Sequence, residues 1–192
     1  MNFDRVRHAL RGAFFTFVRQ PERALAAYRD SLRADPQHVG TLRMLGWLEA
    51  QQQRWPTAET WLARAVELDP KDASTWFNLG WVRDPGGRED AACDAFTRVT
   101  QLAPHNDRAW YGLGMLHARH GRHREAAAAL TEAGRLQPMN GLAWYALGMA
   151  WQHCNEPEKV AEAIEHTLAH DPQTAQRLIR DTGRSDYAAR LG

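Results

Sequence analysis

The chain has 192 residues, a net charge of +1 at pH 7 and 24% charged residues. A balance this even argues against partners that require a strongly basic or acidic surface, such as nucleic acid. Among the 24 basic residues only Lys71 and Lys159 are lysines, and such a preference for arginine is typical of the GC-rich genomes of many bacteria.

The sequence gives no sign of a disulfide, a zinc site or a membrane span. Cys93 and Cys154 are far apart and form no CxxC motif, so both are expected to be reduced thiols on helices. The apolar run from Ala13 to Val18 is much shorter than the ~18 residues that a membrane span needs. We therefore expect a cytoplasmic protein without a metal or a cofactor.

A repeat of 34 residues organises the sequence. It is marked by Leu45-Gly46, Leu79-Gly80, Leu113-Gly114 and Leu147-Gly148, and by Pro36, Pro70, Pro104, Pro138 and Pro172. The period defines five contiguous units, 5–38, 39–72, 73–106, 107–140 and 141–174, which we expect to form one domain. Because a unit of this size cannot bury its own apolar face, the units must stack into a solenoid.

Within each unit, positions 4, 7, 8 and 11 have helical spacing and predict a first helix with one buried face. Glycine occupies position 8 in all five units, although it costs ~1 kcal/mol relative to alanine inside a helix. We therefore expect the second helix of the same unit to pack closely there, with the small residue at position 20 facing the glycine. The tryptophans at position 4, Trp76, Trp110 and Trp144, are assigned wholly to the core.

The first unit departs from this pattern. His8 and Arg11 occupy its packing positions. A different apolar stripe with helical spacing contains Val6, Leu10, Phe14 and Phe17. Either this helix is rotated, or it presents an apolar face to solvent that is a candidate surface for self-association.

Prolines mark the ends of several predicted helices. Pro21, Pro56 and Pro157 are placed for the first turn of second helices, and Pro85 should end the first helix of the third unit early. After the last unit, a charged stretch with scattered apolar residues predicts a capping helix and tail over 175–192, broken near Gly183.

The third and fourth units, which contain TWFNLGWV and AWYGLGMLHARHGRHREAAAALTEAGRLQP, closely resemble the tetratricopeptide repeat family. The family pattern is W-x2-L-G in a first helix, a small and then a larger apolar residue in a second helix, and a final proline. The resemblance covers about nine tenths of the chain. It implies an all-α, right-handed superhelical solenoid of helix-turn-helix repeats, whose first helices line a concave surface that binds protein partners.

Positions 2, 5, 9 and 12 of the first helices form a second stripe, which repeat packing does not require. Aromatic residues and methionine recur in it, and these residues are enriched at the cores of protein interfaces. The predicted partner-binding groove contains Arg43, Trp47, Phe77, Asn78, Trp81, Arg108, Tyr111, Met115, Tyr145 and Met149. The alternative is that some of these rings only seal the seam between neighbouring first helices.

Three of these residues, Arg43, Asn78 and Arg108, match the two-carboxylate clamp with which some tetratricopeptide repeats bind acidic C-terminal peptides of chaperones. Trp47 and Gly112 replace the other two clamp residues, and the alternative is that the arginines are solvated charges at the groove edge. The same two interpretations, an anionic partner or plain solvation, apply to the turn arginines Arg54, Arg88, Arg122 and Arg124.

The sequence contains no recognisable catalytic or metal-binding arrangement. No P-loop, HExxH or glycine-rich dinucleotide motif occurs, and His117, His120 and His123 lack a suitably spaced acidic or cysteine partner. We predict a non-catalytic scaffold or assembly chaperone that holds a peptide or helix of a protein partner. Self-association through the first helix is the alternative, and attachment of that helix and its arginines to a membrane surface is a further one.

Overall fold

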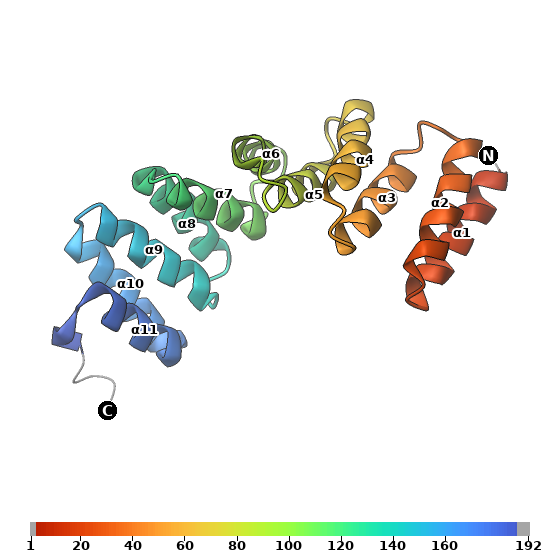
Figure 1. Ribbon diagram of the computed structural model, residues 1–192. Helices are drawn as coiled ribbons and strands as arrows, with labels where there is room; N and C mark the ends of the chain where they lie inside the picture. The colour runs from red at the N-terminus through yellow and green to blue at the C-terminus, as the bar shows by residue number, and fades with distance from the viewer. Residues whose placement is uncertain (1–2, 188–192) are drawn as a thin grey trace. The chain divides into compact units, whose positions relative to one another are not determined.

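The computed structural model describes residues 3–187, and these residues form eleven α-helices and no β-strand (Figure 1). The contacts divide the chain into two compact units, Met1–Leu102 and Ala103–Gly192. The division lies in the loop that follows the sixth helix, next to Pro104. The predicted all-α class is confirmed, and each unit is built from helix pairs joined by short turns.

The first unit contains three helix pairs. They are α1 (Phe3–Phe17) with α2 (Pro21–Ala34), α3 (Val39–Gln51) with α4 (Trp55–Leu68), and α5 (Ala73–Arg83) with α6 (Glu89–Leu102). Its core is formed by side chains from both members of the pairs. Among those fully buried are Leu25, Leu42, Leu45, Leu62, Leu79 and Val99.

The second unit contains five helices. They are α7 (Asp107–Arg119), α8 (His123–Leu136), α9 (Gly141–His153), α10 (Pro157–His170) and α11 (Pro172–Thr182). Its fully buried side chains include Leu116, Leu130, Ile164 and Leu178. Leu178 comes from α11, so the last helix contributes to the core of this unit instead of lying loosely on its surface.

The last residue of each repeat caps the first helix of the next one. The side chains of His38, Asp72, Asn106 and Asn140 accept a hydrogen bond from the backbone N–H of the second or third residue of α3, α5, α7 and α9. Such a cap satisfies one of the donors that a helix start leaves without an intrahelical partner. The 34-residue period therefore recurs in the capping as well as in the core.

Proline has the predicted effect at both ends of helices. α2, α4 and α10 carry Pro21, Pro56 and Pro157 in their first turn, where the missing N–H removes no intrahelical bond. α5 ends at Arg83, two residues before Pro85, and is the shortest of the first helices with 11 residues.

The glycines at position 8 lie where neighbouring helices approach most closely. A Cβ atom on Gly46 would lie 2.5 Å from Cγ of Leu62 and 3.2 Å from the backbone oxygen of Ala58, and one on Gly114 would lie 2.6 Å from Cγ of Leu130. The second helix of the same unit therefore packs there, as predicted. The expected partner needs correction, because in the first four units the nearest side chain belongs to position 24, and at Gly46 and Gly114 position 20 contributes its backbone oxygen. At Gly148 the nearest side chain is Leu178 of α11.

The tryptophans at position 4 are not wholly in the core, contrary to our expectation. Trp76, Trp110 and Trp144 are only partly buried. Their indole Nε1–H groups donate to the backbone oxygens of Pro70, Pro104 and Pro138 at 3.0, 2.9 and 3.1 Å. An indole ring needs a partner for its N–H when it packs, and the proline loop between repeats provides one.

Ion pairs tie the repeats of the first unit together along their turns. Glu49 is almost completely buried and binds Arg29 of α2 at 2.8 Å and Arg54 of the α3–α4 turn at 3.2 Å. Glu59 binds Arg83 at 2.8 Å and Arg88 at 2.7 Å in the same manner. The turn arginines Arg54 and Arg88, which we had considered for an anionic partner, are thus paired with carboxylates of the protein itself.

The capping helix starts earlier than predicted. α11 begins at Pro172 and not at 175, because Asp171 ends α10 and also caps α11 by accepting a hydrogen bond from the backbone N–H of Thr174 at 3.1 Å. Pro172 occupies the first turn of this helix, where its geometry is favourable. The helix ends at Thr182 and is followed by Gly183, the C-cap, which has a φ of 70°. Residues 188–192 of the predicted tail lie outside the described residues.

Candidate functional site

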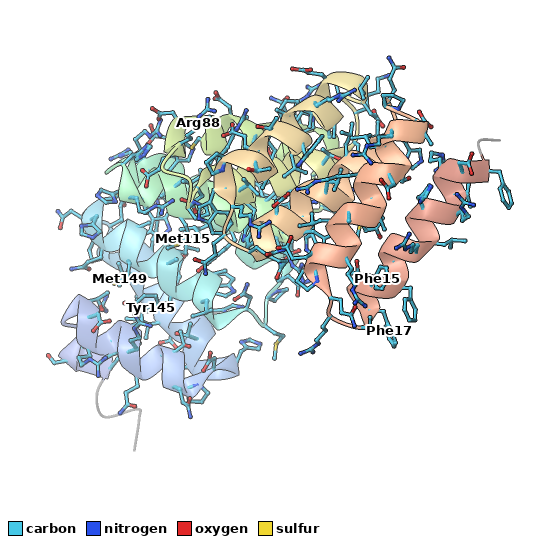
Figure 2. All side chains as sticks on the ribbon, turned by 45° about the vertical axis from the view of Figure 1, so that its right-hand side comes forward. Phe15, Phe17, Arg88, Met115, Tyr145 and Met149 are labelled. Carbon is cyan, nitrogen blue, oxygen red and sulfur yellow. The ribbon has the colours of Figure 1, made fainter. Side chains whose placement is uncertain are left out.

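A hollow of about 290 Å³ lies on the second unit, and four predicted groove residues line it. Tyr111 and Met115 come from α7, and Tyr145 and Met149 come from α9. Figure 2 shows Met115, Tyr145 and Met149 in the same region of this unit. These residues occupy positions 5 and 9 of adjacent repeats, so the second stripe of the first helices forms one continuous wall here.

The rim of this hollow is held by the capping helix. The hydroxyl of Tyr145 donates to Oδ2 of Asp181 at 2.7 Å, and the guanidinium carbon of Arg177 lies 4.3 Å from the centre of the Tyr145 ring. Burial, together with the hydrogen bond to Asp181, raises the pKa of Tyr145. The same hydrogen bond lowers the pKa of Asp181, so at neutral pH the phenol is the donor and the carboxylate is the acceptor.

Sequence reasoning missed part of the lining. Leu142 and Ala118 lie at positions 2 and 12, so the stripe itself could have identified them. His123 and His153, whose rings stack at 4.3 Å, and Arg177 come from outside the stripe and carried no local signal. Among the described residues that line the hollow, none is acidic.

The predicted groove residues of the first unit divide into two kinds. Trp47 is 37% exposed and Trp81 is 42% exposed, and the Trp81 ring packs edge-to-face on Trp55 at 5.8 Å. Phe77 is partly buried and packs edge-to-face on Phe96 of α6 at 5.6 Å. The two tryptophans therefore keep part of their surface exposed to solvent, whereas Phe77 mainly holds its own repeat together.

The polar residues do not assemble into a carboxylate clamp within either unit. Nη1 of Arg43 lies 2.8 Å from Oδ2 of Asp72, the capping residue of α5. Burial acts to raise the pKa of Asp72, but the hydrogen bond from Thr75 and the charge of Arg43 outweigh it and leave this pKa lowered. Arg43 is thus committed to the protein's own carboxylate. Asn78 is partly buried on α5 of the first unit, and Arg108 is exposed on α7 of the second.

The first helix presents an apolar face to solvent, which was one of the two expected alternatives. Leu10, Phe14 and Phe17 are exposed, whereas Val6 is partly buried. Val6 and Leu10 both line a hollow beside Tyr28 and Met44. Phe17 lies at the end of α1 where the chain turns into α2 (Figure 2).

The histidines of the fourth repeat form no metal site in the part of the chain that the structure describes, where no cluster of three metal-ligating side chains occurs. His120 accepts from Arg122 at 2.6 Å. Burial, together with the charge of Arg122, lowers the pKa of His117. Over residues 3–187 no helix is long and apolar enough to cross a bilayer.

Helix pairs with a tryptophan and a glycine in the first helix, a small residue in the second and a closing proline define a helical-repeat scaffold for protein interaction. A model of the tetratricopeptide repeat matches residues 18–73, 77–133 and 111–170. The chain belongs to the tetratricopeptide repeat family, and the predicted resemblance is confirmed.

Solved structures of similar fold agree with this assignment. One structure of MamA is 25% identical and covers 86% of this chain and 96% of its own, with a TM-score of 0.80. YrrB, described as a TPR protein with an unusual peptide-binding site, is 20% identical, covers 92% of each chain and has a TM-score of 0.80. PilF of Pseudomonas aeruginosa is 16% identical, covers 98% of this chain and 88% of its own, with a TM-score of 0.75. A comparison with curated proteins found no match.

Proposed function

We propose that this protein is a non-catalytic scaffold or assembly chaperone, which binds an extended or helical segment of a partner protein on the second stripe of its first helices. The observation that carries the proposal is the hollow on the second unit. Tyr111, Met115, Tyr145 and Met149 were singled out from the sequence alone, and all four line it. Its volume of about 290 Å³ is enough for one or two bulky apolar side chains.

The walls of the hollow favour an apolar occupant. Met115 and Met149 supply flexible, polarizable side chains that adapt to the shape of a partner residue. Tyr111 and Tyr145 add rigid surface, and aromatic residues of this kind dominate interface hot spots. At the rim, Arg177 is already paired with Asp181 of the same helix at 3.6 Å, so a carboxylate of the partner would compete with Asp181 and we expect the occupant to be apolar.

Trp47 and Trp81 are the corresponding anchors on the first unit. Each occupies position 9 of its repeat, on α3 or α5, and keeps more than a third of its surface exposed. Tryptophan is enriched at interface cores and among hot-spot residues, which supports a role for these exposed indoles in binding. YrrB, which has this fold, is described as having a peptide-binding site, and this supports a peptide as the type of ligand.

The first experiment tests the hollow with a displayed library of random peptides, because the natural partner is not needed to probe the surface. Peptides selected on the intact protein should share at least one bulky apolar residue. The double variant Met115→Ser/Met149→Ser should bind them at least tenfold more weakly, which corresponds to about 1.4 kcal/mol. The matched control is Met139→Ser, the same change at an exposed position away from the hollow.

The affinity of each variant for the selected peptides is measured by titration calorimetry. Only variants whose far-UV circular dichroism equals that of the unchanged protein are compared, so that loss of helix does not explain a change in affinity. Unaltered affinity of the double variant would remove the hollow as the binding site. The variant Trp47→Ala/Trp81→Ala tests the first unit in the same assay. If both double variants capture the selected peptides as well as the parent does, the proposed function is wrong.

A further inference from the structure

The exposed stripe of α1 lies outside the core of the first unit. Phe3, Leu10, Phe14 and Phe17 are 77, 67, 60 and 85% exposed. At 100° per residue these four side chains fall within about 60° of one another around the helix. Gly12, the residue through which α1 packs on the ring of Tyr28, lies on the opposite side. The stripe therefore points away from the unit that carries it.

The surroundings of the stripe are basic. Residues 3–23 contain five arginines, Arg5, Arg7, Arg11, Arg19 and Arg23, and two acidic residues, Asp4 and Glu22. Since the whole chain has a net charge of only +1, the remaining residues are net negative. Arg7 and Arg11 lie on one flank of the stripe, where both are exposed. The exposed apolar face of α1 thus lies in a segment whose net charge is positive.

We infer that α1 is a membrane-surface anchor, which inserts the Phe3, Leu10, Phe14 and Phe17 stripe into the interface of an anionic bilayer while its arginines contact lipid phosphates. A helix that buries an apolar face at the headgroup boundary and keeps arginine on its flank is the arrangement that binds such a surface. Each arginine near an anionic surface strengthens the binding about fivefold. The anchor goes beyond the proposed scaffold function and fixes where the scaffold acts.

A second copy of the chain is the less suitable occupant. The four side chains offer on the order of 500 Å² of apolar surface, whereas a stable interface needs about 800 Å² from each partner. Pairing two copies through this stripe would also bring two clusters of arginines together, at a cost in repulsion. An anionic bilayer has neither restriction, because it supplies opposite charge and can bury the entire face.

The test is flotation of the full chain with vesicles of phosphatidylcholine alone and vesicles that contain about one third phosphatidylglycerol, an anionic lipid. The unchanged protein should float with the anionic vesicles only, and raising the salt to ~0.5 M should weaken the binding. Phe14→Ser/Phe17→Ser should lower the partition coefficient at least tenfold. Arg7→Gln/Arg11→Gln should lower it roughly thirtyfold while leaving the apolar face intact.

The matched control is Leu68→Ser/Met139→Ser, which removes exposed apolar surface elsewhere and should leave flotation unchanged. Absence of binding to anionic vesicles, or equal binding by Phe14→Ser/Phe17→Ser, overturns the inference. Light scattering tests whether a second copy of the chain covers the stripe instead. If the protein is a dimer that Phe14→Ser/Phe17→Ser dissociates, and it does not bind vesicles, the stripe is a contact between copies and the inference is wrong. Peptide capture in solution does not involve α1, so the scaffold proposal and the anchor can fail independently.

Discussion

His38 shows how one side chain can join capping, packing and pH sensitivity. Its Nδ1 accepts from the backbone N–H of Thr41 at 3.1 Å, and its Nε2 lies 2.9 Å from Nη1 of Arg5. Burial and the charge of Arg5 lower the pKa of His38, and Asp35 opposes them only in part. The folded protein therefore holds this imidazole neutral at a pH where the unfolded chain begins to protonate it.

Because folding lowers the pKa of His38, the unfolded state binds more protons, and the free energy of unfolding should decrease as the pH falls below about 6.5. The loss continues until the pH has passed the folded-state pKa. We expect His38→Asn to reduce this dependence between about pH 7.5 and 5.5. Asparagine is the natural choice, since Asn106 and Asn140 cap α7 and α9 at the same repeat position.

The measurement is urea unfolding of both proteins across this pH range. At about pH 8 the two free energies should agree within ~0.5 kcal/mol, because asparagine keeps the acceptor of the cap. His117 and His166 also have lowered pKa values, from burial first, so the slope should become smaller without vanishing. An identical slope in the two proteins would show that His38 does not contribute.

At the scale of the helices, one face of each first helix serves packing and another is left to face outward. The packing face depends on glycine, since Gly46 admits Leu62 and Gly80 admits the ring of Phe96. The two contacts are not equally close. A Cβ atom on Gly46 would lie 2.5 Å from the Leu62 side chain, whereas one on Gly80 would lie 3.1 Å from the Phe96 ring. The space available for a side chain at position 8 therefore differs from one repeat to another.

This grading predicts different costs for the same substitution. Gly46→Ala should lower the free energy of unfolding by about 1–3 kcal/mol, because Leu62 and the backbone of Ala58 must move. Gly80→Ala should be close to neutral, because a small shift of the Phe96 ring is offset by the ~1 kcal/mol gain in helix propensity. Urea titrations of the two variants provide the comparison, and equal costs would refute the packing explanation.

At the scale of the whole molecule, the chain consists of two compact units, and the boundary between them in the sequence falls after Leu102. The first unit contains three complete helix pairs and its own buried leucines. A helical repeat cannot bury its face alone, and about three of them are needed for independent stability. Residues 1–102 satisfy this requirement.

We therefore expect a fragment of residues 1–102 to fold by itself. Its far-UV circular dichroism should show helix in proportion to its length, and its urea unfolding should be cooperative. A shorter fragment, 1–70, has only two helix pairs and should lose most of its helicity. A fragment 1–102 that is unfolded, or no better ordered than the shorter one, would contradict this prediction.

The sequence alone determined the helix pairs, their order and the packing glycines. These features follow from local rules: apolar spacing selects a helix face, proline fixes its ends, and a repeated glycine indicates a close approach. It also located Tyr111, Met115, Tyr145 and Met149 on one stripe, because that stripe repeats with the same 34-residue period.

Only the tertiary structure decided how the candidate site residues are used. Arg43 binds Asp72, 29 positions away, and Tyr145 binds Asp181, 36 positions away. Phe77 packs on Phe96, whereas Trp81 is exposed. Side-chain contacts between repeats depend on which rotamers can pack together in space, and the spacing of residues along the chain does not specify them. The positions of the helices are therefore set by residues that are close in the sequence. Whether a groove side chain is exposed depends on contacts with residues that are far away in the sequence.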